Sequence, residues 1–201
     1  MEIITLRPHQ IRTASEVLAA SFFDYPMFTF YFPDKSRRAR YLPWYFQRIL
    51  NVAQHYGEIY VTADLSGVIF TLPPTHNKIS LWEYAQNGFC LTPFILGLRN
   101  YTRSMKCEAF VHQTREKIMK DRQHYYLWGV AVGPHTKRTG VGSRLLNFIF
   151  EKASKEKMPI YLETHDEKNV PYYQKHNFDL MKSAHIPEYD LPFWCMVREV
   201  K

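Results

Sequence analysis

Two glycines, Gly140 and Gly142, stand where an apolar strand gives way to an amphipathic helix. The strand ends near Val132, and apolar residues then recur at helical spacing from Val141 to Ala153. A glycine-rich turn at a helix N-terminus leaves several backbone N–H groups free, and these favour a bound anion, usually a phosphate. Glycine also lets the backbone approach that anion without an intervening Cβ. The sequence therefore predicts a phosphate-binding loop at the start of this helix.

Two common phosphate-binding patterns do not fit this turn. The dinucleotide pattern G-x-G-x-x-G needs a glycine where Leu145 stands, and the Gly-Lys-Ser/Thr of a P-loop does not follow. The turn instead resembles Gln/Arg-x-x-G-x-G/A, the pyrophosphate loop of the GCN5-related N-acetyltransferases, the GNAT family. Lys137 departs from this pattern, because lysine keeps the positive charge but lacks the planar, bidentate donors of arginine. An ordinary strand-to-helix turn is the alternative. The loop residues are Lys137, Arg138, Thr139, Gly140, Val141, Gly142 and Ser143.

A second resemblance to the same family lies in the last third of the chain. The segment 169–178, Asn-Val-Pro-Tyr-Tyr-Gln-Lys-His-Asn-Phe, follows an apolar strand and is similar to the family helix N-x-P-x-Y-x-K-x-G-F. Asn177 replaces the usual glycine, and asparagine is the next-best residue where a helix end needs a positive φ. The closing segment 191–199 resembles the last strand of the family. The order of these segments is most similar to the puromycin N-acetyltransferase-like subgroup, and the resemblance is strong over 124–199.

The resemblance implies an α/β (α+β) fold, in which helices flank a single mixed, mostly antiparallel sheet. The sheet would splay between the two central strands that end near Val132 and His165, and coenzyme A would lie in that gap. Periodicity and turn residues predict strands at 2–7, 57–63, 66–72, 124–132, 159–165, 178–183 and 191–199. They predict helices at 8–22, 34–56, 79–121, 140–155 and 169–176, with a kink at Pro43 and a break at Pro93. We expect one domain, 1–201, with 79–121 as an aromatic-rich helical insertion.

Binding of acetyl-CoA, the cofactor that the resemblance implies as co-substrate, would use mainly backbone groups. The pyrophosphate is assigned to N–H groups of 138–143, and the pantetheine amides to the backbone of Val130, Ala131 and Val132. A β-bulge near 129–130 would leave an N–H to polarise the thioester carbonyl. Asn169 is expected either to hydrogen-bond the cofactor or to cap the helix that follows it.

The acid that protonates the departing thiolate is predicted to be Tyr173, by its position in the 169–178 segment, and Tyr173 is accordingly also expected to contact the cofactor. A phenol can donate a proton to a thiolate without being ionised at neutral pH. Its neighbour Tyr172 is expected to face the core, because adjacent helical residues point in different directions. The alternative for Tyr173 is a core tyrosine, in a chain with 14 tyrosines.

The base that takes a proton from the acceptor amine is predicted to be Glu163, directly or through a water molecule. An alkylammonium must lose a proton before its nitrogen can attack. A polar residue at a strand end is the alternative role for Glu163, and His165 and His124 are weaker candidates. Because holding amine and thioester together is itself a large rate effect, no covalent intermediate is needed. Cys195, in an apolar run, is expected to be a buried structural thiol.

Composition narrows the classes of partner. The chain has 26 basic and 19 acidic residues, a formal net charge of +7, which suits phosphate-bearing partners such as coenzyme A or a nucleic acid. Its dense basic cluster, 35–40, opens a helix with an apolar face, and without a known binding module we expect no nucleic-acid partner. The apolar stretch 88–98 is too short to span a bilayer, so no membrane partner is expected.

The cysteines and the N-terminal segment indicate the cellular compartment in which the protein is expected. The 3 cysteines form neither a disulfide pattern nor zinc-ligand spacing, so we expect no metal and a reducing environment. The segment 1–7 lacks a signal-like pattern, and a cytoplasmic location is expected.

The sequence thus predicts an enzyme, an acetyl-CoA-dependent N-acetyltransferase acting on a primary amine of a small molecule or peptide. Aromatic residues of 79–121 and 22–32 are expected to shape the acceptor pocket. One alternative is a GNAT domain that binds acyl-CoA without turnover, as a sensor or partner domain, and a less favoured one is a basic nucleic-acid-binding protein. The sequence does not identify the acceptor amine, the preferred acyl chain or the physiological role. A homodimer formed through the final strands is compatible with the sequence.

Overall fold

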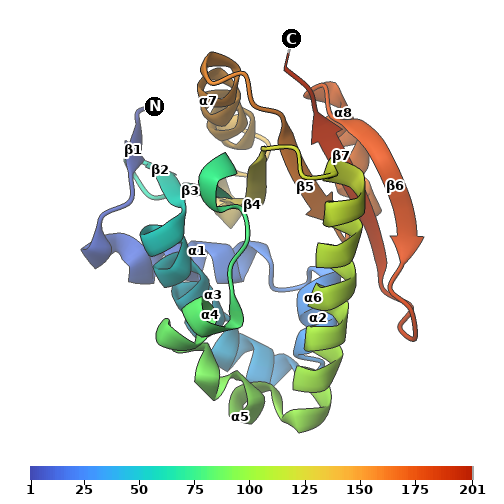
Figure 1. Ribbon diagram of the computed structural model, residues 1–201. Coiled ribbons are helices and arrows are strands. Elements are labelled where there is room, and N and C mark those ends of the chain that lie inside the picture. Colours follow the sequence, from blue (N-terminus) through green and yellow to red (C-terminus); the bar gives the residue numbers. More distant parts are fainter. Residues whose placement is uncertain (201) are drawn as a thin grey trace.

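The computed structural model describes residues 1–200 and contains a seven-stranded sheet with the order β1-β2-β3-β4-β5-β7-β6 (Figure 1). Every neighbouring pair is antiparallel except β4 and β5, which run parallel. The expectation of a mixed, mostly antiparallel sheet is confirmed. The strands are β1 (Ile3–Thr5), β2 (Glu58–Thr62), β3 (Gly67–Leu72), β4 (Tyr125–Val132), β5 (Ile160–Thr164), β6 (Asp179–His185) and β7 (Pro192–Arg198).

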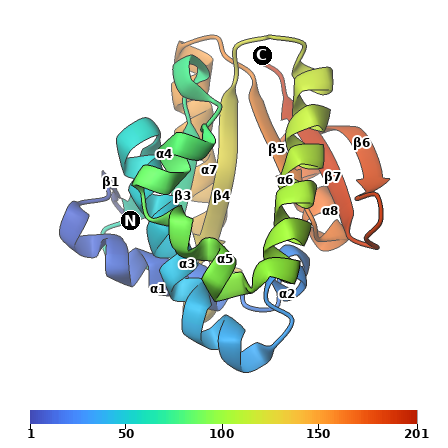
Figure 2. The same cartoon turned by 60° about the horizontal axis from the view of Figure 1, so that its bottom comes forward.

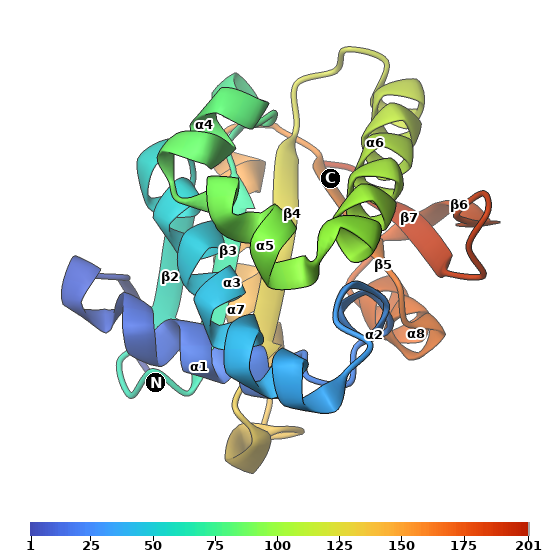
Figure 3. The ribbon, with the colours of Figure 1, turned by 90° about the horizontal axis from the view of Figure 1, so that it is seen from below.

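Helices cover both faces of the sheet. One face packs mainly against α1, α3 and α6, and the other against α7 and α8 (Figures 1 and 3). No helix within residues 1–200 is long and apolar enough to cross a membrane. The helices are α1 (Ile11–Ser21), α2 (Pro26–Tyr31), α3 (Lys35–Tyr56), α4 (Leu81–Gln86), α5 (Thr92–Leu96), α6 (Leu98–Met119), α7 (Val141–Lys155) and α8 (Val170–Lys175).

The segment expected to be one broken helix, 79–121, forms three helices. Its breaks lie at Gly88 and Gly97, which both adopt a positive φ, +89° and +78°. Pro93, the expected break, instead sits in the first turn of α5, where its missing N–H costs nothing. Pro43 lies inside α3, which continues through it. Glycine conformation, rather than proline, therefore divides this segment.

The two central strands part soon after they begin. β4 and β5 pair only at Tyr125 with Ile160 and at Tyr126 with Tyr161. Beyond these pairs β4 stays bonded to β3 and β5 to β7, so the two halves of the sheet diverge, as Figure 2 shows. The predicted splay is confirmed. It leaves backbone N–H and C=O groups in the middle of a sheet without a neighbouring strand, where a ligand can bond them.

Burial of one helix face holds the start of α7 beside the end of β4. All six predicted apolar positions are buried, and four of them are 0% exposed. Each of the larger side chains contributes roughly 1.5–3 kcal/mol by leaving water, and the alanine contributes less. The turn before α7 lies at the surface, and the buried side chains of α7 hold it in place. The six positions are Val141, Leu145, Leu146, Ile149, Phe150 and Ala153.

One tyrosine ties the loop between α1 and α2 to the end of β5. The Tyr25 hydroxyl accepts a hydrogen bond from the His165 N–H and lies 3.0 Å from Thr164 Oγ1. Asn169 Nδ2 also donates to Thr164 Oγ1, at 3.0 Å. Burial raises the pKa of Tyr25 to about 12, so the hydroxyl keeps its proton. These bonds fix the segment that leads into α8.

We expect Tyr25→Phe to lower the free energy of unfolding by about 1–3 kcal/mol, because the buried His165 N–H loses its acceptor. Urea unfolding measures this change. Tyr101→Phe is the matched control, since the half-buried Tyr101 makes no hydroxyl hydrogen bond within residues 1–200. Equal stability of the two variants would contradict the bridging role of Tyr25.

Candidate functional site

The start of α7 presents backbone donors to solvent. The N–H groups of Val141, Gly142 and Ser143 have no acceptor within residues 1–200, as expected of a first helical turn. Gly140 caps the helix with φ +85°, and a Cβ there would meet no atom within 4 Å, so glycine serves conformation rather than space. Arg138 also has a positive φ, +65°. Free N–H groups and the helix dipole favour an anion here.

The second glycine of the loop is required by close packing. A Cβ on Gly142 would lie 3.0 Å from the Tyr172 hydroxyl and 3.5 Å from Val132 Cγ2. The ends of α8 and β4 therefore meet the first turn of α7. Tyr172 packs, partly buried, against the core between α7, α8 and the sheet, as expected, and its hydroxyl lies 3.4 Å from Ser143 Oγ. Ser143 Oγ also lies 3.1 Å from Nε2 of His176.

The backbone of β4 borders the splay. Val130, Ala131 and Val132 pair with β3 on one side, while the side toward β5 has no strand partner beyond Tyr126. The β-bulge expected near 129–130 lies one residue earlier: Gly129 and Leu127 pair with consecutive residues of β3, which leaves Trp128 as the extra residue. The remaining loop residues Lys137, Arg138 and Thr139 are exposed.

Tyr173 lies half-buried on α8 with a hydroxyl that makes no hydrogen bond within residues 1–200. Its ring packs against Phe178 and Tyr172, at centroid distances of 5.6 and 5.5 Å. Burial raises its pKa, with Tyr25 as a further cause, so the phenol keeps its proton at neutral pH. Asn169, which precedes α8, uses its amide on Thr164 and makes no side-chain cap. A protonated, unbonded phenol is the state that a proton donor needs.

Glu163 lies on β5, partly exposed, on the sheet face that α6 covers. The Tyr126 hydroxyl donates to one carboxylate oxygen, and the other oxygen, Oε2, is buried without a hydrogen-bond partner within residues 1–200. Burial raises the pKa of Glu163 to about 7, against the lowering effects of the Arg115 charge and of Tyr126. A carboxyl with a pKa near neutrality suits a general base.

Sequence reasoning missed two charged residues of α6 that act on Glu163. Glu108 is exposed, yet surrounding protein raises its pKa, and it accepts a 2.6 Å hydrogen bond from the Tyr31 hydroxyl. Arg115 is 6% exposed and lies over the ring of Tyr126, with its Cζ 4.3 Å from the centroid. Their spacing of seven residues places them on one helix face. That spacing was the only signal, and the sequence does not say which sheet face α6 covers.

The weaker candidates have structural roles. His165 is buried, its Nδ1 lies 3.0 Å from the Pro192 carbonyl oxygen, and burial lowers its pKa to about 4. His124 is buried near the start of β4, with Nδ1 2.7 Å from the Arg122 carbonyl oxygen and a lowered pKa. Cys195 is 0% exposed, and burial raises its pKa to about 12, which confirms a buried thiol. Neutral, buried groups of this kind are poor proton acceptors.

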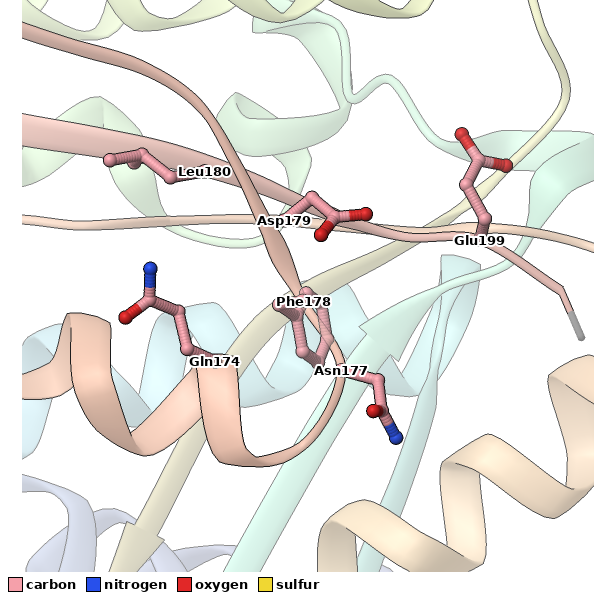
Figure 4. A pocket seen from close by; sticks show the side chains of 6 residues that line it. All are labelled: Gln174, Asn177, Phe178, Asp179, Leu180 and Glu199. Atoms are coloured by element: carbon pink, nitrogen blue, oxygen red, sulfur yellow. The ribbon is translucent and has the colours of Figure 1, made fainter.

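A surface hollow of about 390 Å³ lies elsewhere, between α8, β6 and the end of β7 (Figure 4). None of the predicted site residues lines it, and its Glu199 carboxylate already pairs with Arg122, with Nη2 to Oε2 at 2.6 Å. No group of three or more potential metal ligands occurs within residues 1–200. The chemistry described above is therefore concentrated around the splay rather than at this hollow.

Comparison with known proteins agrees with this geometry. An uncharacterized N-acetyltransferase of Schizosaccharomyces pombe is 22% identical over 195 residues, which cover 94% of this chain and 79% of that protein. The structure of histone acetyltransferase HPA2 and related acetyltransferase from Corynebacterium glutamicum superposes with a TM-score of 0.68 at 18% identity, over 99% of this chain and 96% of that one. The PaiA N-acetyltransferase of Thermoplasma acidophilum, in complex with coenzyme A, gives 0.59 at 14% identity, over 98% of each chain.

The family model of the acetyltransferase (GNAT) family matches residues 101–178. This stretch runs from α6 through the splay and the loop before α7 to the end of α8. Residues 101–178 therefore match the acetyltransferase (GNAT) family model, and the chain as a whole has the fold of the acetyltransferase structures to which it is similar.

Proposed function

We propose that this protein transfers an acetyl group from acetyl-CoA to a primary amine of a small molecule or peptide, in a ternary complex. The observation that carries the proposal is the parting of β4 and β5 directly beside the unbonded first N–H groups of α7. The free edge of β4 can hydrogen-bond an amide-containing chain as a neighbouring strand would. The N–H groups of α7 can bind an anionic group at the end of that chain. Coenzyme A has both chemical parts, and a coenzyme A complex is known for the PaiA enzyme of similar fold.

The groups that would hold the cofactor are mostly backbone. N–H groups of 138–143 would bind the pyrophosphate, with the exposed Lys137 and Arg138 adding positive charge. The free edge of β4 at 130–132 would bond the pantetheine amides. Asn169 would contribute through its amide oxygen or its second amide N–H, because the bond to Thr164 uses only one of the two amide hydrogens. When bound, acetyl-CoA supplies the activated acyl group.

Two side chains would move the protons. Glu163 takes a proton from the acceptor ammonium, and the freed nitrogen bonds to the carbonyl carbon as the carbon–sulfur bond breaks. Tyr173 donates its proton to the departing thiolate sulfur, and the second proton, which the nitrogen loses after it bonds to the carbonyl carbon, returns to the Tyr173 phenolate. Tyr25 lies electrostatically close to both groups, since the Glu163 charge raises the pKa of Tyr25, and Tyr25 in turn raises that of Tyr173. Tyr173 packs on the α8 side of the sheet and Glu163 lies on the α6 side, so acid and base would approach the splay from opposite faces.

The first prediction concerns cofactor binding. Acetyl-CoA should raise the melting temperature of the protein, because a ligand bound only by the folded state stabilises that state. NAD and ATP serve as controls and should give no comparable shift. Gly140→Ala should weaken the acetyl-CoA shift, since alanine disfavours a φ of +85° in the loop. No shift at millimolar acetyl-CoA would contradict the proposed function.

The second prediction separates an enzyme from a non-catalytic acyl-CoA-binding domain. Tyr173→Phe should lower kcat by roughly 10²-fold or more and leave coenzyme A binding unchanged, because only the proton donor is lost. Thiol release with an amine panel measures turnover, starting with aminonucleosides because of the sequence resemblance to the puromycin N-acetyltransferase-like subgroup. Tyr60→Phe, on β2, is the control. Binding of acetyl-CoA without turnover in the unmodified protein would favour the non-catalytic alternative.

The third prediction is a pH profile. Glu163 must be deprotonated to act, so kcat/KM for the acceptor should rise with pH and level off above about 7. Glu163→Gln should lose roughly 10²–10⁴-fold in activity and lose this inflection.

The same substitution has an expected effect on stability. Folding raises the pKa of Glu163 from 4.5 to about 7, so this group destabilises the fold increasingly as pH rises through that window. Melting of Glu163→Gln should therefore depend less on pH between 5 and 8 than melting of the unmodified protein. Identical dependence in both proteins would contradict the assigned pKa.

A further inference from the structure

Arg115 is a buried cation without a bonded partner. The residue is 94% buried, its Nε is sealed from solvent, and its side chain makes no hydrogen bond or ion pair within residues 1–200. Its closest described interaction is with the ring of Tyr126. A guanidinium stays charged at all relevant pH values and carries five N–H donors. Nε of Arg115 is a sealed donor without a partner, which is costly, and the terminal nitrogens, which are not sealed, have no partner in the described chain either.

A second buried arginine in the same chain provides a contrast. Arg38 is 2% exposed, but it donates to the Phe32 carbonyl oxygen at 2.7 Å and approaches Asp24 at 3.5 Å. Its role in the fold is therefore evident from its bonds. Arg115 has no such bonds. Its positive charge nevertheless acts on two carboxylates, Glu108 and Glu163, where it opposes the increase in pKa that burial causes.

Both carboxylates are bonded elsewhere. Glu108 accepts from Tyr31, and Glu163 accepts from Tyr126. The negative charges of the two carboxylates stabilise the buried positive charge of Arg115, but the carboxylates do not hydrogen-bond its N–H groups. The terminal nitrogens of the guanidinium are therefore available to a partner from outside the described chain, and the planar fork of arginine is matched best by a carboxylate, which it binds through two parallel hydrogen bonds.

We propose that Arg115 binds a carboxylate of the acceptor, so that the acceptor is an amino acid or a close relative with a free carboxylate. This inference rests on the proposed N-acetyltransferase function. Tyr126 connects the two ends of such a molecule, since its ring supports Arg115 and its hydroxyl bonds Glu163. A carboxylate on Arg115 would place an amine a few bonds away beside the base.

The charges around Arg115 suit a zwitterion. Arg115 complements the carboxylate, and the two nearby acids, Glu108 and Glu163, complement the ammonium group before it loses its proton. Glu108 stands on the same face of α6 as Arg115, and its exposed carboxylate would repel a second anionic group on the acceptor. Amino acids with an acidic side chain should therefore be poor acceptors.

The experiment compares amino acids that have primary amines with their carboxamides, which keep the amine and lose the carboxylate charge. The unmodified protein should show a higher kcat/KM for the acids. Arg115→Met should lower the ratio of kcat/KM for the preferred acid to kcat/KM for its carboxamide by about 10- to 100-fold, as expected for loss of a charged hydrogen bond. Loss of the Arg115 charge also changes the pKa of Glu163, but this effect is common to both substrates and leaves the ratio unchanged. Arg115→Lys, which keeps the charge, should recover part of the loss for the acid alone.

Binding gives a readout independent of turnover. The N-acetylated form of the preferred amino acid, measured by calorimetry in the presence of coenzyme A, should bind the unmodified protein and not Arg115→Met. Melting curves establish that each variant is folded, and Arg115→Lys and Arg115→Gln replace Arg115→Met if it is not. If acetyl-CoA neither shifts melting nor turns over with any amine, the proposed function itself fails.

Three results would overturn the inference while leaving the proposed function intact. The first is an equal loss for acids and carboxamides with a shifted pH profile, which would make Arg115 only a positioning residue for Glu163. The second is a preference of the unmodified protein for carboxamides or diamines, which would indicate a cationic acceptor. The third is turnover with other amines but neither turnover nor binding with any amino acid.

Discussion

The parting of β4 and β5 is the constraint on which the rest of the structure depends. Two residue pairs join the strands at Tyr125 and Tyr126, and each strand is then held only by its outer neighbour, β3 or β7. A sheet interior with unbonded amides is unfavourable unless a ligand or water takes their hydrogen bonds. These unbonded amides lie where burial of the α7 face also brings the free N–H groups of its first turn to the end of β4. The proposed binding of acetyl-CoA therefore depends mainly on the arrangement of the backbone.

Side-chain chemistry is distributed unequally over the two faces of the sheet. The α8 side contributes Tyr173, whose burial favours the protonated phenol. The α6 side contributes Glu163, Glu108 and Arg115, whose charges act on one another through protein rather than through bulk water. Electrostatic interactions are stronger in such surroundings. Burial, with a smaller contribution from the Glu108 charge, raises the pKa of Glu163 to about 7, while the positive charge of Arg115 and the hydrogen bond from Tyr126 limit the rise.

The network around Thr164 connects stability with the site. Tyr25 and Asn169 both bond Thr164, so the loop after α1, the end of β5 and the start of α8 are held together. Tyr173 lies on the helix that this network orients, and Glu163 is the residue before Thr164. A hydroxyl in the first quarter of the chain therefore helps to position the proposed acid and base from the last quarter.

The sequence by itself determined the local elements and the backbone chemistry. Periodicity and glycine placement predicted α7 and its loop, and the 169–178 motif predicted α8 and the positive φ of Asn177, which is +62°. These features depend on neighbours within a few residues, so the chain order contains them. Tertiary structure alone decided that Tyr172 meets Ser143 and that α6 brings Arg115 beside Tyr126. Such contacts depend on helix orientation and on long-range packing, which local patterns do not specify.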